Sequence, residues 1–108
     1  MASDFPEADW KRFKKIHTQL LERYCASILQ ELAAVSLGSE GTAHERYLRA
    51  YELIEDRNDK MANAFDDFRR STACLQLALM RRLGLLTDED LSVFSDQTQT
   101  RVRTIASL

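Results

Sequence analysis

The chain has 108 residues, of which 44% are hydrophobic and 30% are charged, and its formal net charge is −2. These values are typical of one folded domain spanning 1–108, and they exclude a disordered chain and a strongly basic nucleic-acid-binding protein. No apolar run reaches the ~18 residues of a membrane span. The first residues do not have the pattern of a secretory signal, and there are only two cysteines, so we expect a cytoplasmic protein with reduced thiols.

The first predicted element is a helix over about residues 5–36. Asp4 is a suitable N-cap, Pro6 suits the first turn, and Glu7 completes the spacing of a capping box. Apolar residues then recur every three or four positions, and no further glycine or proline occurs before Gly38. Leu37 followed by Gly38 predicts that the helix ends with Gly38 in the left-handed conformation.

The second predicted helix runs from 43 to 83, after a short polar turn. Thr42 and Glu45 have the spacing of a second capping box. The apolar positions of this segment alternate in steps of four and three, which is a heptad pattern. The positions of this seam are Tyr47, Tyr51, Ile54, Asn58, Met61, Phe65, Phe68, Thr72, Leu75 and Leu79, and Asn58 is a polar residue in a core position. The unbroken pattern favours one helix, and the polar stretch 56–59 is where we expect any kink or break.

Gly84 is a natural C-cap for the second helix, and Thr87 with the acidic residues after it opens another. Ser95 can restart that helix, which would give two short pieces. The predicted fold is therefore all-α: a long antiparallel hairpin with a C-terminal helical segment packed back against it, forming a bundle that is completed by dimerisation.

The expected dimer interface lies in the segment just before Gly84, which is apolar on nearly every side. Such a helix needs neighbours on several sides. If the first two helices pair antiparallel, residues beyond about 75 extend past the first helix, and one terminal helix covers only one side. We therefore expect a homodimer built on Leu75, Leu77, Leu79, Met80 and Leu83. The alternative is a monomer in which the terminal helix and a broken second helix provide enough cover.

The residues that could carry chemistry are scattered. Cys25 and Cys74 lie far apart along the predicted hairpin, as do His17 and His44, so neither pair can form a disulfide or share a metal ion within one hairpin. The sequence has no Glu-x-x-His pair and no glycine-rich phosphate loop. We expect no enzymatic activity, no metal and no cofactor.

Basic residues gather at the end of the predicted hairpin opposite its turn. They are Lys11, Arg12, Lys14, Lys15, Arg69 and Arg70. This patch is either a solvated surface whose charges pair with neighbouring aspartates, or a site for an acidic protein partner or for nucleic acid.

The predicted function is a small non-enzymatic module for protein–protein interaction and oligomerisation. The alternative is a nucleic-acid-binding accessory protein that uses the basic patch. A third hypothesis, a small-molecule binder, requires an internal cavity beside Tyr47, Tyr51 or His17.

Overall fold

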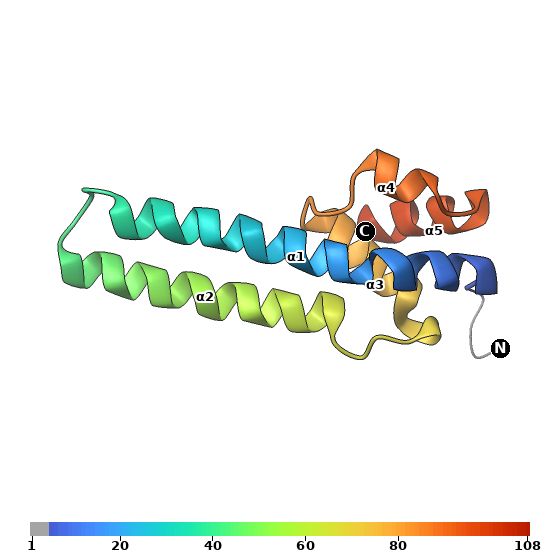
Figure 1. Ribbon diagram of the computed structural model, residues 1–108, viewed down its shortest axis with the longest axis horizontal. Helices are drawn as coiled ribbons and strands as arrows, with labels where there is room; N and C mark the ends of the chain where they lie inside the picture. The colour runs from blue at the N-terminus through green and yellow to red at the C-terminus, as the bar shows by residue number, and fades with distance from the viewer. Residues whose placement is uncertain (1–4) are drawn as a thin grey trace.

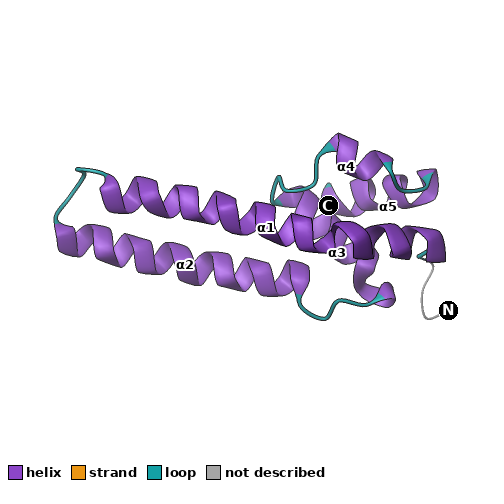
Figure 2. Cartoon of the chain, in the orientation of Figure 1, coloured by secondary structure: helices purple, strands orange, loops and turns teal. Residues whose placement is uncertain are grey.

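The computed structural model describes residues 5–108, and every regular element among them is helical (Figure 2). The elements are α1 (Glu7–Leu37), α2 (Ala43–Phe65), the short 3-10 helix η1 (Arg70–Thr72), α3 (Ala73–Arg82), α4 (Asp88–Ser92) and α5 (Asp96–Ala106). α1 and α2 form a long hairpin, and α3, α4 and α5 gather at the end away from its turn (Figure 1). The predicted all-α fold, with a hairpin and C-terminal helices packed back on it, is confirmed.

The molecule is elongated. Its extents are 53 × 25 × 25 Å, and its radius of gyration is 16.4 Å, whereas a compact domain of this length has a radius of about 13 Å. The extra length comes from the α1–α2 hairpin, whose turn lies far from the other helices (Figure 1).

The ends of α1 differ from the prediction. The helix begins at Glu7 with Pro6 in the N-cap position, and Asp4 lies outside the described residues. Gly38 follows the helix in an extended conformation with φ −70°, so the predicted left-handed stop is wrong. A Cβ atom on Gly38 would lie 2.9 Å from the Ala34 carbonyl oxygen, so this position requires glycine because of close contact rather than a positive φ.

The second predicted helix breaks, but not at the expected place. α2 continues through 56–59 and ends at Phe65, and the chain reverses over 66–69, where Asp67 has a φ of 54°. The buried Gln76 side-chain amide donates to the Asp66 carbonyl oxygen and lies 3.4 Å from that of Asp67. Gln76 thus satisfies backbone groups that a continuous helix would have satisfied itself.

Most of the hydrophobic core lies at one end of the molecule, which we call the body (residues 5–23 and 60–108), and Tyr24 and Ile28 extend the core into the next part of α1. The largest fully buried side chains lie there: Phe13, Leu20, Leu77, Met80, Leu86, Leu91 and Val102, with Thr98 and Asp9. We call residues 24–59 the distal hairpin. No residue between 29 and 63 is fully buried.

A buried carboxylate joins the first and last helices of the body. Asp9 is 0% exposed and accepts hydrogen bonds from the Ser95 backbone N–H at 3.0 Å, the Ser95 hydroxyl at 2.6 Å and the Thr98 hydroxyl at 2.6 Å. Arg12 donates to the same carboxylate at 2.8 Å. Burial by itself would raise the pKa of Asp9, but the hydrogen bonds from Ser95 and Thr98 outweigh it and lower the pKa.

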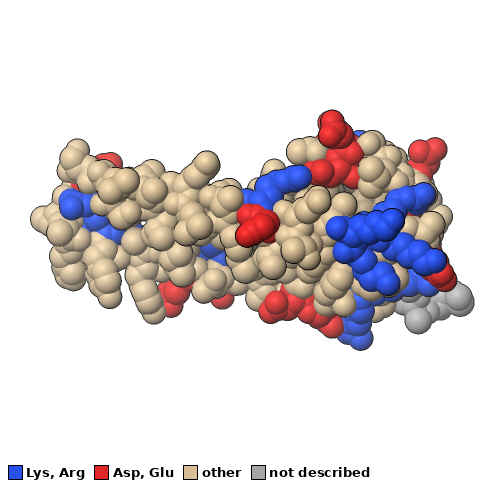
Figure 3. Space-filling model, in the orientation of Figure 1, with Lys and Arg blue, Asp and Glu red and all other residues tan. Residues whose placement is uncertain are grey.

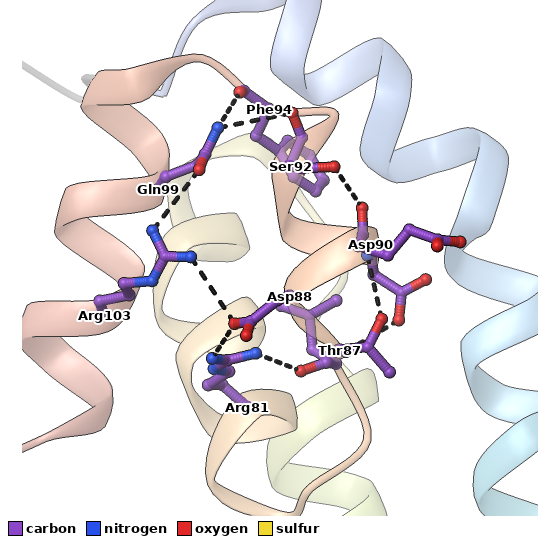
Figure 4. A network of polar contacts seen from close by, with 10 residues as sticks. Arg81, Thr87, Asp88, Asp90, Ser92, Phe94, Gln99 and Arg103 are labelled. Atoms are coloured by element: carbon purple, nitrogen blue, oxygen red, sulfur yellow. Dashed lines mark hydrogen bonds and ion pairs between the residues drawn. The ribbon is translucent and has the colours of Figure 1, made fainter.

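Polar contacts join the start of α4 to both α3 and α5 (Figure 4). Arg81 forms an ion pair with Asp88, and its other terminal nitrogen donates to the Leu86 carbonyl oxygen at 2.8 Å. Arg103 of α5 lies 3.6 Å from the same carboxylate. The predicted starts of α4 and α5 are confirmed, because Thr87 forms a capping box and Ser95 caps α5.

Candidate functional site

The segment expected to form the dimer interface is largely enclosed by its own chain. Leu77 and Met80 are 0% exposed, and Leu79 and Leu83 are partly buried against the core. Only Leu75, at 53%, is exposed. The prediction that this segment lacks cover is therefore wrong for Leu77 and Met80, which cannot contact a second chain without unfolding the body.

The break at 66–69 explains this difference. It directs α3 back into the body, where α3 packs along α5 and also contacts α2. The prediction assumed a straight second helix extending beyond α1, and such a helix would have left the same leucines uncovered.

Most of the six residues of the basic patch are engaged by their own chain. Lys11 pairs with Glu7 at 3.4 Å, and Arg12 pairs with Asp9. Lys14 lies 5.6 Å above the ring of Trp10. Arg69 pairs with the Asp67 carboxylate at 2.8 Å, and Arg70 donates to the Phe5 carbonyl oxygen at 2.6 Å.

The histidines and cysteines do not come together. His17 stacks on Phe68 with ring centroids 3.7 Å apart, and its burial lowers the pKa of the imidazole. His44 is exposed near the start of α2. Cys25 and Cys74 are free thiols, and burial raises the pKa of Cys74. Within residues 5–108, no three His, Cys, Asp or Glu side chains are grouped so that they could hold a metal ion.

Most of the large hydrophobic side chains that are exposed among the described residues lie on the distal hairpin, where the sequence prediction did not place them. Tyr47 and Tyr51 are 66% and 57% exposed, so they do not line the internal cavity that a small-molecule binder requires. Leu29 of α1 is 63% exposed. Beside Leu29, an apolar hollow of about 180 Å³ lies between α1 and α2, lined by Cys25, Ile28, Leu29, Ile54, Arg57, Asn58 and Met61.

These residues share one side of the hairpin. On α2 the positions 47, 51, 54, 58 and 61 follow steps of four and three, so they form one row along the helix. Ile54 and Met61, at the body end of this row, are partly buried against the core. The neighbouring row of α2 is also partly buried: Arg46, Ala50, Leu53 and Arg57. We call the surface formed by Cys25, Leu29, Tyr47, Tyr51, Ile54, Asn58 and Met61 the open hairpin face.

The opposite side of the hairpin is charged. There Arg57 donates to both carboxylate oxygens of Glu31, at 2.7 and 3.3 Å, and forms an ion pair with Asp56. Lys60 lies 3.0 Å from Asp56. The end of α3 lies on this side, because Arg82 lines a hollow together with Glu31 and Lys60. The two sides of the hairpin thus differ both in charge and in their cover by α3.

Figure 3 shows the side of the molecule that α3 does not cover. Uncharged side chains occupy most of the distal hairpin in this view, whereas Lys and Arg gather over the N-terminal part of α1. The charge of the whole distal hairpin is nevertheless negative: residues 24–59 contain seven acidic and three basic side chains, a net charge of −4. The rest of the chain has a net charge of +2.

One feature of the sequence indicates the open hairpin face. Between residues 24 and 37 the only charged side chain is Glu31, so α1 is nearly uncharged on all sides there. Among residues 5–108, no helix is long and apolar enough to cross a lipid bilayer. Comparisons of the chain with protein-family models, with curated proteins and with solved structures found no match.

Proposed function

We propose that the protein is a non-enzymatic helical module that binds another protein chain through the open hairpin face. The observation that carries this proposal is the contrast between the two parts of the molecule. The body has a buried core, whereas no residue between 29 and 63 is fully buried and Leu29, Tyr47 and Tyr51 are more than half exposed.

A two-helix hairpin has no inner layer of its own, and most of the stability of a protein helix comes from burying its apolar face. A large exposed apolar patch on a folded protein commonly marks a site of interaction. The body provides the rigid end on which α1 and α2 are held, so the hairpin presents the open hairpin face in a fixed arrangement.

A photo-crosslinking amino acid at Tyr51 tests this proposal in cells that make the protein. We expect adducts between position 51 and a second polypeptide, of whatever mass, because a bound partner would lie directly on this side chain. The same amino acid at Leu75, which is similarly exposed but lies on the body, is the matched control and should give no comparable adduct. Equal adducts at both positions, or none at position 51, would contradict the proposal.

Binding of nucleic acid through the basic patch has weaker support, because Lys11, Arg12 and Arg69 form ion pairs within the chain. The distinguishing measurement is binding of a labelled oligonucleotide at low and moderate salt. A phosphate-binding surface loses affinity steeply as salt rises. We expect no salt-sensitive binding.

A further inference from the structure

We propose that the open hairpin face pairs with the same face of a second copy of this chain, with the two hairpins antiparallel. This inference rests on the proposed function and adds the identity of the partner. It also moves the expected homodimer interface from the segment before Gly84 to the distal hairpin.

The size of the open hairpin face suits a small dimer interface. From Tyr47 to Met61, α2 rises by ~21 Å, and two neighbouring helices are ~20 Å wide, which gives a flat area of about 400 Å² on each copy. Two copies would bury about 800 Å² in total, below the roughly 1,200–2,000 Å² of stable specific interfaces and in the range of weak, transient ones. We therefore expect a weak dimer that dissociates on dilution.

The position of α3 leaves room for a second copy. Arg82 and Leu83, at the end of α3, lie beside Ser27 and Glu31 on the charged side of the hairpin. The apolar hollow beside Leu29 is lined only by residues of α1 and α2. A second hairpin can therefore approach the open hairpin face without meeting the C-terminal helices of the first.

The charges favour a second copy in the antiparallel orientation. Lys14 and Cys25 are 11 positions apart, which is about three helical turns, so the basic end of α1 continues the open hairpin face into the body. In an antiparallel pair, the turn end of each hairpin, with Glu40 and Glu45, lies against the basic end of α1 in the other copy. A parallel pair would instead place the two turn ends, each with Glu40 and Glu45, side by side.

The same charges count against a partner helix of one sign. An acidic helix along this face would meet the acidic distal hairpin, and a basic helix would meet Lys11 and Lys14. A second copy of this chain has both an acidic hairpin and a basic end, and in the antiparallel orientation each lies near the opposite charge. Such a pair has a two-fold axis, which is the commonest symmetry of protein dimers.

Sedimentation equilibrium of the whole chain from about 1 to about 500 μM tests the pairing. We expect the mean mass to rise from monomer towards dimer. Leu29→Glu places a carboxylate in the interface and should weaken dimerisation at least ~10-fold. Leu75→Glu, at the other exposed leucine, is the matched control and should change the dissociation constant less than ~2-fold. Circular dichroism checks that both variants remain helical, and Tyr51→Glu replaces Leu29→Glu if that variant unfolds.

The orientation has its own test. Lys14→Glu should weaken an antiparallel dimer several-fold, and added salt should weaken the wild-type dimer, since in both cases attraction between opposite charges is lost. A dimer that Lys14→Glu leaves unchanged, and that salt strengthens, would refute the antiparallel orientation.

Three other results would refute self-pairing: a wild-type chain that stays monomeric throughout, equal effects of the Leu29 and Leu75 variants, or no effect of either. A monomer that still forms Tyr51 adducts with a different polypeptide would refute self-pairing alone and leave the proposed function standing. A monomer that forms no adducts would contradict both.

Discussion

Replacing Asp9 by alanine should strongly destabilise the body, because this one carboxylate joins α1 to the start of α5. Asp9 and Ser95 are 86 positions apart in the sequence, and the contact between them closes most of the chain into one unit. Asp9→Ala removes the acceptor for the Ser95 backbone N–H and for the hydroxyl groups of Ser95 and Thr98. Thr98 is only 1% exposed, so its hydroxyl cannot turn to bulk water.

The magnitude follows from these contacts. A hydrogen bond to a charged group contributes about 1.5–3 kcal/mol, and the three donors do not add fully because Ser95 is only partly buried. Arg12 contributes little, since 47% of its side chain is exposed. We therefore expect Asp9→Ala to lower the free energy of unfolding by about 3–5 kcal/mol, a large part of the roughly 5–15 kcal/mol of a typical domain.

Urea unfolding followed by circular dichroism measures this loss, and a double-mutant cycle with Thr98→Val isolates the pair. We expect the double variant to lose less stability than the sum of the single variants, because Thr98→Val removes the hydroxyl that Asp9→Ala leaves without an acceptor. A loss below about 1 kcal/mol for Asp9→Ala, or simple additivity in the cycle, would refute this account of the contact.

The pH dependence gives an independent check on the same residue. The pKa of Asp9 is lowered by folding, so the unfolded chain takes up a proton there before the folded chain does. The contribution of Asp9 to stability is complete above the ordinary pKa of 3.8 and is lost as the pH falls from there through the lowered folded value. Asp9→Asn should therefore lose less stability than the wild type over this acidic range.

Three further predictions concern single side chains. Burial lowers the pKa of His17, so the contribution of this residue to stability should be complete above the ordinary pKa of 6.5 and should fall as the pH drops from there through the folded value. Urea unfolding of His17→Leu at the same pH values should not show this decrease. The buried Tyr24 hydroxyl has no hydrogen-bond partner, so Tyr24→Phe should change the free energy of unfolding by between 0 and about +1 kcal/mol, and a clear loss would reveal a partner for this hydroxyl. Gly84 has a φ of 74°, so Gly84→Ala should lower the free energy of unfolding by about 1 kcal/mol, and an unchanged value would contradict a left-handed conformation there.

Local signals in the sequence predicted much of this fold. The capping boxes at Thr42 and Thr87, the restart at Ser95 and the left-handed Gly84 all depend on residues within one turn of the helix end. The long apolar pattern of residues 5–36 is likewise local, and it gave α1 nearly to its observed end. These features need no knowledge of the rest of the chain.

The features that the sequence did not predict depend on distant residues. The apolar pattern passes through 66–69 without interruption, so nothing local indicates the break that Gln76 stabilises. Asp9 is an ordinary acidic residue in the first turn of a helix, and its burial becomes apparent only when α5 is placed against it. Tyr47 and Tyr51 fit a heptad seam, but both are more than half exposed, whereas Ala50 and Leu53 in the neighbouring row are partly buried.

The break at 66–69 accounts for the cover of the predicted interface, and the position of α3 on the charged side of the hairpin leaves the open hairpin face uncovered. Two segments of this sequence are apolar on nearly all sides, 73–83 and 24–37, and each needs neighbours on several sides. The break folds the first of these segments into the body, where Leu77 and Met80 are fully buried. α3 ends beside Ser27 and Glu31, so it does not reach the part of the second segment nearer the turn of the hairpin. The argument from uncovered apolar surface therefore still applies, but to Leu29 and its neighbours, and a second copy of the hairpin would supply the missing layer.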